Sequence, residues 1–174
     1  RIKAVSVKEG RSGSLCFVVV RHEFYVGDVL RVAAEHDIVY RQEADPSVAP
    51  PEPPMAPAEA DWSQTITTDP VTLFRYSALT FNSHRIHYDR PYCIEVENYD
   101  GLVIHGPLTT TWLLDFVRRQ VPDAKINHFS FRAISPLFDT NPVTIAGKFE
   151  DGKIDLWAAN HQGHLAMQAT ATLA

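Results

Sequence analysis

A proline-rich stretch divides the chain and limits what it can fold into. Between Gln42 and Asp61 the sequence reads "QEADPSVAPPEPPMAPAEAD", which holds six of the chain's twelve prolines. Each proline fixes its own φ angle and lacks a backbone N–H donor, so we expect residues 42–61 to form an extended linker without regular structure. The chain then consists of two unequal parts, residues 1–41 and residues 62–174.

The amino-terminal part, residues 1–41, has the pattern of a small antiparallel sheet. "IKAVSV" alternates, "SLCFVVVRHEF" has the composition of a buried strand, and "VGDVLRVAAEHDIVYR" returns after a turn at Gly27-Asp28. The "GRSG" sequence of residues 10–13 predicts the first turn. Three strands cannot bury both faces of a sheet, so we expect them to pack on the second part or to need a covering helix from further sequence. Because Arg1 already lies in a strand pattern, we expect the natural protein to extend further at this end.

The second part, residues 62–174, has the pattern of a complete α+β domain. A first helix is expected after the candidate cap Asp69, with Pro70 at its first position, and a second helix is expected to begin at Gly106 in "HGPLTTTWLLDFVRRQ". Four strand patterns follow, with hairpin signals at Asp151-Gly152 and Gln162-Gly163: "INHFSFRAI", "PVTIAGKFE", "KIDLWAAN" and "HLAMQATATL". A long helix followed by an antiparallel sheet is an α+β layout.

Apolar residues recur at helical spacing in both expected helices, which predicts one apolar face on each. In the first helix they are Leu73, Phe74, Ala78 and Phe81, and in the second they are Leu108, Trp112, Leu113, Phe116 and Val117. The second helix is expected to lie buried against the sheet.

The composition narrows the classes of partner. The net charge is −5 and no run of lysine or arginine occurs, so nucleic acid is not an expected partner. The longest apolar run, "LCFVVV", is far too short to span a bilayer, and no membrane association is expected. Cys16 and Cys93 show no pairing logic, which favours a reduced, cytoplasmic protein.

The candidate site is the polar stretch "TFNSHRIHYD" at residues 80–89, between the two expected helices. His87 can move protons near neutral pH, and the amide of Asn82 can orient a water molecule. About twenty residues later Gly106 begins the second helix, where free backbone N–H groups and the helix dipole can stabilise a developing negative oxygen. Together these groups suit the addition of water across an activated double bond, or its reverse.

The paired signals "YSALTFNSHRIHYD" and "GLVIHGPLTTTWLL" resemble those of the MaoC-like (R)-specific hydratases and dehydratases, which have the hot-dog fold. The resemblance covers residues 62–174. It implies a curved antiparallel sheet around a long central helix, with residues 1–41 as an incomplete amino-terminal hot-dog-like strand set. The family's catalytic aspartate falls on Asn82, its catalytic histidine on His87, and its carbonyl-binding glycine N–H on Gly106.

Two departures from the family motif bear on the substrate. Asn82 cannot ionise, and the motif's proline is replaced by Arg85, a pattern most similar to the mesaconyl-CoA-type hydratases. A guanidinium can bind a free carboxylate bidentately, so the resemblance implies a branched dicarboxylic acyl thioester, with coenzyme A favoured over a carrier protein. We assign His84, Arg85 and His105 to substrate binding. No cofactor is implied, and the resemblance implies a homodimer or paired hot-dog units.

Other interpretations of the same residues stay open at this point. By spacing alone His84, His87 and His105 could hold a metal ion, although we expect none because no cysteine or carboxylate cluster completes the set. A hot-dog thioesterase would need a carboxylate in the site, which Asn82 does not supply. A non-catalytic hot-dog unit that binds an acyl group is the third possibility.

Overall fold

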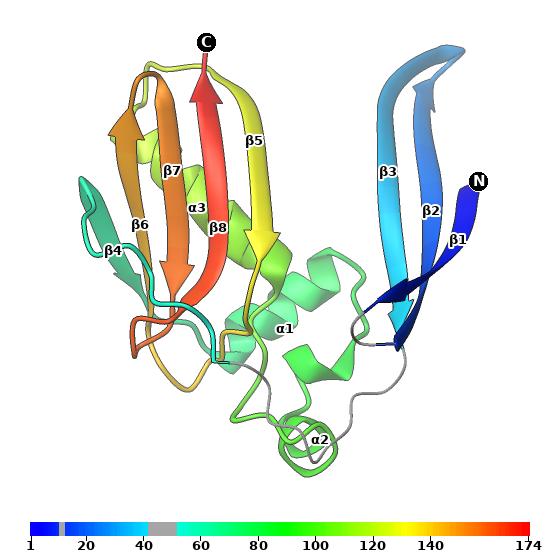
Figure 1. Ribbon diagram of the computed structural model, residues 1–174, viewed down its shortest axis with the longest axis horizontal. Coiled ribbons are helices and arrows are strands. Elements are labelled where there is room, and N and C mark those ends of the chain that lie inside the picture. The colour runs from blue at the N-terminus through cyan, green and yellow to red at the C-terminus, as the bar shows by residue number, and fades with distance from the viewer. Residues whose placement is uncertain (11–12, 42–51) are drawn as a thin grey trace. The chain divides into compact units, whose positions relative to one another are not determined.

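The computed structural model describes residues 1–10, 13–41 and 52–174, and the chain divides into two compact units, Arg1–Pro51 and Glu52–Ala174 (Figure 1). The centre of the turn expected at residues 10–13 and the first half of the proline-rich stretch lie outside the described residues. The assignment of residues 1–41 to a second hot-dog unit stays a prediction.

The first unit is a three-stranded antiparallel sheet in the order β1-β2-β3, as the alternating patterns predicted. Its strands are β1 (Ile2–Gly10), β2 (Gly13–Val26) and β3 (Val29–Arg41). Gly27 has a φ of +57° in the tight connection between β2 and β3, which accounts for glycine there. Most of the larger apolar side chains on its strands are exposed: Val5 is 60% and Val7 is 66% accessible. The described part of this sheet therefore has no core of its own.

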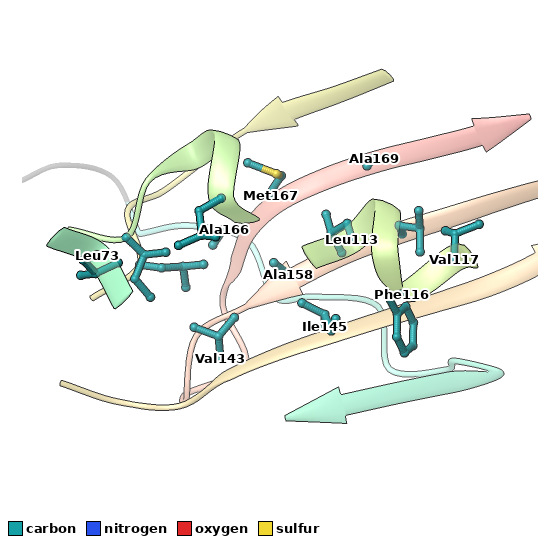
Figure 2. Packing of buried hydrophobic residues seen from close by; sticks show 14 of the residues in the cluster. Leu73, Leu113, Phe116, Val117, Val143, Ile145, Ala158, Ala166, Met167 and Ala169 are labelled. Carbon is teal, nitrogen blue, oxygen red and sulfur yellow. The ribbon is translucent and has the colours of Figure 1, made fainter. Parts of the chain in front are cut away.

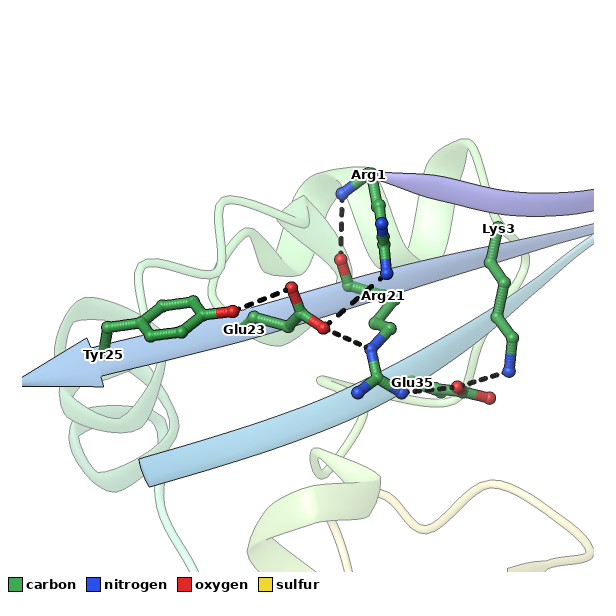
Figure 3. Close-up of polar contacts among 6 residues, drawn as sticks. All are labelled: Arg1, Lys3, Arg21, Glu23, Tyr25 and Glu35. Carbon is green, nitrogen blue, oxygen red and sulfur yellow. Dashed lines mark hydrogen bonds and ion pairs between the residues drawn. The ribbon is translucent and has the colours of Figure 1, made fainter. Parts of the chain in front are cut away.

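A row of charged side chains connects the three strands of this sheet (Figure 3). Arg21 of β2 donates to Glu23 at 2.7 Å and to Glu35 of β3 at 3.2 Å. Lys3 of β1 donates to the same Glu35 at 2.6 Å, and the amino group of Arg1 donates to the Arg21 carbonyl. Each carboxylate is thus paired with a cation: Glu35 with cations of β1 and β2, and Glu23 with Arg21 two residues away on β2.

The second unit is a five-stranded antiparallel sheet packed on one long helix. The strand order is β4-β6-β7-β8-β5. The strands are β4 (Trp62–Ile66), β5 (Ile126–Ala133), β6 (Val143–Glu150), β7 (Lys153–Ala159) and β8 (Leu165–Leu173). The helix α3 (Gly106–Gln120) lies across one face of the sheet (Figure 1). The α+β layout predicted from the sequence is confirmed.

The core lies between α3 and the inner face of the sheet. Leu113, Phe116 and Val117 of α3 are at most 1% exposed and pack against Ile145 of β6 and Ala169 of β8 (Figure 2). The predicted apolar stripe of α3 is confirmed, with Trp112 partly buried at its edge. A helix with such a stripe cannot move along the sheet without exposing it, so the helix N-terminus is fixed in place.

Two shorter helices precede α3. The helix α1 (Pro70–Leu79) begins as predicted, because the Asp69 carboxylate accepts a hydrogen bond from the Thr72 N–H at 2.7 Å. The helix α2 (Arg90–Glu95) follows a 3₁₀ turn at Arg85–His87. The expected burial of the apolar face of α1 holds for Leu73, but Phe74 is 59% and Phe81 is 97% exposed. α1 lies beyond the end of the sheet, so only part of that face meets the core (Figure 1).

The described end of the proline-rich stretch, residues 52–61, is attached to the second unit by backbone hydrogen bonds. The Ala56 N–H donates to the Gly163 carbonyl, and the Leu165 N–H donates to the Pro54 carbonyl. These residues therefore lie along the start of β8. None of the helices in the described part of the chain is long and apolar enough to cross a lipid bilayer.

Candidate active site

The side chain of His87 is held at the end of the 3₁₀ turn by one hydrogen bond. It is 7% exposed, and its Nδ1 lies 2.7 Å from the carbonyl oxygen of Val103. A carbonyl oxygen can only accept, so Nδ1 carries the ring proton and Nε2 keeps its lone pair. Burial lowers the pKa of His87 below its usual range, and His84 nearby acts in the same direction. His87 is thus a neutral base at neutral pH.

A second histidine fixes the plane of the first. The rings of His87 and His105 stack with centroids 3.7 Å apart and 16° between their planes. His105 is 1% exposed, its Nε2 lies 2.8 Å from the Ser77 hydroxyl, and Tyr76 meets it edge-on. Its Nδ1 is buried and has no hydrogen-bond partner among the residues that the structure describes. Burial and the neighbouring His87 lower the pKa of His105 to about 4, so both rings are neutral at pH 7.

The N-terminus of α3 begins next to this stack. His105 is the N-cap residue of α3 and Gly106 is its first residue, as predicted. Gly106 lines a cavity of about 270 Å³ together with Val103, Thr109 and Met167. The Gly106 backbone at the positive end of the helix dipole therefore lies beside a small, partly apolar cavity, which suits a developing oxyanion.

Asn82 lies in a different hollow from Gly106. Its Oδ1 accepts a hydrogen bond from the His84 N–H at 3.0 Å, and its Nδ2 group can donate to a ligand. Asn82 lines an apolar hollow of about 300 Å³ with Phe74, Ser77 and other residues near the end of α1. Ser77 thus connects the two regions, because its hydroxyl also contacts His105.

Arg85 and His84 are exposed beside His87. The Arg85 Nε and one terminal nitrogen both reach Asp89 Oδ2, at 3.0 and 2.8 Å, and the guanidinium lies 4.1 Å from the centre of the Tyr92 ring. The Asp89 carboxylate also caps α2 by accepting a hydrogen bond from the Tyr92 N–H. The His84 ring approaches His87 edge-on at 5.8 Å. Within the described residues no three His, Cys, Asp or Glu side chains are grouped to hold a metal ion.

Several residues around the site carried no signal in the sequence. Tyr76 lies outside the apolar face predicted for α1, but it is partly buried against His105. Ser77 had no assigned role, and its contact with His105 joins residues 28 positions apart. Arg90 and Asp139 form an ion pair close to the His87 segment. These partners are brought together only by the fold, so local patterns could not identify them.

A family model described as hydroxyacyl-thioester dehydratase type 2 matches residues 1–139. Mesaconyl-C(4)-CoA hydratase from Chloroflexus aurantiacus is 42% identical over 99% of this chain and 61% of its own length. The mitochondrial hydroxyacyl-thioester dehydratase type 2 of Schizosaccharomyces pombe is 42% identical over 48% of this chain and 28% of its own length. The chain thus spans less than two thirds of these curated relatives.

Solved structures confirm the fold that the resemblance implied. A MaoC-like dehydratase from Phytophthora capsici aligns with a TM-score of 0.71 and 16% identity over 99% of this chain and 61% of that one. HtdX from Mycobacterium tuberculosis aligns with a TM-score of 0.66 and 24% identity over 99% of this chain and 67% of its own. At these identities the alignments establish the hot-dog fold alone.

Proposed function

The chain belongs to the hydroxyacyl-thioester dehydratase type 2 family, and we propose that it catalyses the reversible hydration of an α,β-unsaturated acyl thioester. The observation that carries this proposal is the hydrogen bond from His87 Nδ1 to the Val103 carbonyl. It leaves a neutral imidazole with a basic Nε2, on a ring that stacks on His105, the N-cap residue of α3. A base and an oxyanion-binding helix end are the two groups that water addition to an enoyl thioester requires.

In the proposed hydration His87 acts twice, first as a base toward water and then as an acid toward the α-carbon. His87 Nε2 takes a proton from water while the water oxygen bonds to the β-carbon, and the electron pair of the double bond moves to the thioester oxygen as an enolate. The Gly106 N–H and the α3 dipole stabilise that enolate, and removing one such donor typically costs roughly 10²–10³ in rate. The proton on His87 then passes to the α-carbon, which gives a 3-hydroxyacyl thioester.

Asn82 takes the place of the family's aspartate and has a binding role in this proposal. Its Nδ2 would donate to the water oxygen, and that water would approach from the hollow at the end of α1 that Asn82 lines. A donor to the water oxygen positions a lone pair toward the substrate without accepting a proton. Proton transfer then rests on His87 alone, which agrees with the lowered pKa of that ring.

We propose a branched dicarboxylic acyl-CoA as the substrate class. The support is Arg85 and the 42% identity to a protein named mesaconyl-C(4)-CoA hydratase. Arg85 uses its Nε and one terminal nitrogen for Asp89, so its remaining N–H groups are available to a substrate carboxylate. His84, exposed beside His87, is the other polar group that a substrate would meet.

We further propose that the hot-dog domain works as a pair. β5 is mostly exposed, with Phe131 53% accessible, and no strand of the described residues pairs with its outer edge, which is therefore the proposed site for a second unit. The partner would be a second copy or a second unit of a longer chain.

The two unpaired cysteines fit a reducing compartment such as the cytoplasm.

The function is tested by mixing the protein with mesaconyl-CoA, crotonyl-CoA and the saturated butyryl-CoA. Loss of enoyl absorbance without release of thiol is the expected result. Release of free coenzyme A would instead indicate a thioesterase. Binding of the thioesters with neither change would indicate a non-catalytic acyl-binding unit.

A further inference from the structure

We infer that Asp139, together with Arg90, is a positioning residue for the proposed site. Asp139 lies in the connection before β6, outside both sequence motifs, and its side chain is 2% exposed. A carboxylate this deeply buried is costly unless each oxygen is paired, so its partners identify its role. The inference rests on the proposed function, because the residue it positions is His87.

The two oxygens of Asp139 bind two segments that are distant in sequence. Its Oδ2 accepts from the Arg90 guanidinium at 2.5 Å, and its Oδ1 accepts from the Leu102 N–H at 2.9 Å. Arg90 follows His87 by three residues and starts α2. Leu102 precedes Val103, whose carbonyl is the acceptor for His87. The carboxylate thus joins the segment of the base to the segment of its acceptor.

Backbone hydrogen bonds extend this connection on both sides. The Asp139 N–H donates to the Leu102 carbonyl at 3.0 Å, and the Ile104 N–H donates to the Leu137 carbonyl at 2.8 Å. On the opposite side the Val103 N–H donates to the Ile86 carbonyl at 2.9 Å. The segment of residues 101–104 is therefore held between the loop of Asp139 and the turn of His87, and it leads directly into Gly106.

The packing around Gly101 leaves this segment little freedom. A Cβ at Gly101 would lie 2.6 Å from Thr140 Cγ2 and 2.9 Å from Asp139 Oδ1, both far inside normal contact. Glycine lets the backbone come this close to the carboxylate. Without the Asp139 side chain the Leu102 N–H and the Arg90 charge would both lose their partner, and only backbone hydrogen bonds would hold the Val103 carbonyl relative to His87.

The consequence for catalysis is geometric. Misplacing a reacting group by about 1 Å can cost roughly 10² in rate, even when the changed residue does not touch the substrate. We therefore expect Asp139→Ala to lower kcat by about 10- to 100-fold while KM changes less than about threefold. Asp139→Asn keeps an acceptor for Leu102 but loses the charge for Arg90, so its kcat should lie between those of the alanine variant and the wild type. Arg90→Gln should resemble the asparagine variant.

The test uses kinetics and imidazole ¹⁵N NMR on the same samples of the full chain. Asp115→Ala is the control, because Asp115 forms an exposed pair with Arg119 on α3 and should leave kcat unchanged. In the wild type, NMR should show protonated Nδ1 and unprotonated Nε2 for His87, and in Asp139→Ala a mixture of tautomers. The Arg90 side chain is 40% exposed, so Arg90→Gln should disturb the fold less than Asp139→Ala. It provides the test if Asp139→Ala does not fold.

Two outcomes would overturn the inference: wild-type kcat in folded Asp139→Asn and Arg90→Gln, or an unchanged His87 tautomer in folded variants with reduced kcat. A wild-type protein that converts no thioester would refute the proposed function. The NMR measurement would then still decide whether Asp139 orients His87, so the two failures are distinguishable.

Discussion

The imidazole rings of His87 and His105 lie face to face, 3.7 Å apart, and each has a different polar partner. His87 donates to the Val103 carbonyl, whereas His105 contacts the Ser77 hydroxyl. The hydrogen bond fixes one direction of the His87 ring and the stack fixes its plane, so together they determine where Nε2 points. Two positive charges at this distance would repel strongly, so protonation of one ring to the imidazolium form disfavours protonation of the other.

The stability of the second unit should depend on pH through these rings. The pKa of His105 is lowered from 6.5 to about 4 by burial, so the unfolded chain binds a proton more readily than the folded one between these values. The free energy of unfolding should therefore be highest above pH 6.5, where His105 is neutral in both states. It should fall as the pH decreases toward 4, because the unfolded chain takes up the proton first. The loss from His105 is at most about 3 kcal/mol, at 1.36 kcal/mol per pKa unit. Urea unfolding of wild type and His105→Phe at several pH values checks this, and an equal pH slope in both would contradict it.

Stacking on His105 should support catalysis because it holds the plane of the His87 ring. His105→Phe keeps a flat ring next to His87, whereas His105→Ala removes it and admits water. We expect His105→Ala to lower kcat by about tenfold or more, with the acid limb of the pH profile moved to higher pH, because solvation restores the pKa of His87 toward its usual value. His105→Phe should keep most of kcat and the position of the limb. Equal losses in both variants would show that His105 acts through its nitrogen atoms.

Two glycines near the site should respond differently to alanine. At Gly101 a Cβ would lie 2.6 Å from Thr140, whereas at Gly106 the nearest atom, of Met167, is 4.0 Å away. Gly101→Ala should therefore destabilise the protein by about 1–3 kcal/mol through overpacking. Gly106→Ala should leave stability unchanged but lower activity, because the new methyl group narrows the cavity where the thioester would bind. Thermal unfolding and kinetics of both variants check these two expectations. A destabilised Gly106→Ala protein would contradict the finding that a Cβ has room at Gly106.

Arg85 should determine the preference for a free carboxylate on the substrate. Arg85→Ala should lower kcat/KM for mesaconyl-CoA by about tenfold relative to crotonyl-CoA, which corresponds to roughly 1.4 kcal/mol. Arg85→Lys should recover only part of this preference, because an ammonium cannot bind bidentately. Asp89→Asn is the matched control: it weakens the competing ion pair but keeps an N-cap for α2. An unchanged ratio of the two substrates in Arg85→Ala would remove Arg85 from substrate binding.

Local patterns predicted most of the elements because their signals are short-range. The Asp69 cap of α1, the start of α3 at Gly106 and the Asp151-Gly152 hairpin, where both residues have positive φ, follow from neighbouring residues. The short strand β4 and the helix α2 were not predicted. β4 has only five residues, and its pairing partner β6 lies about eighty residues away.

The site was predicted in part for the same reason. His87 and the start of α3 are brought together by the fold as the motif resemblance implied, and the hydrogen bond to Val103 could not be read from spacing. The exposure of Phe81 was missed because the chain leaves the helix there with a φ of +53°, which ends the apolar face. The partners Ser77, Arg90 and Asp139 depend on contacts across 28 to 49 positions, which no local pattern contains.

The most direct test of the account is the rate of hydration of mesaconyl-CoA by His87→Ala compared with wild type. We expect the rate to fall by at least about 10²- to 10⁴-fold, the usual contribution of a general base. The fold, followed by circular dichroism, and the affinity for the thioester should stay close to wild type. A folded His87→Ala protein that hydrates the substrate at the wild-type rate would contradict the assignment of His87 as the base.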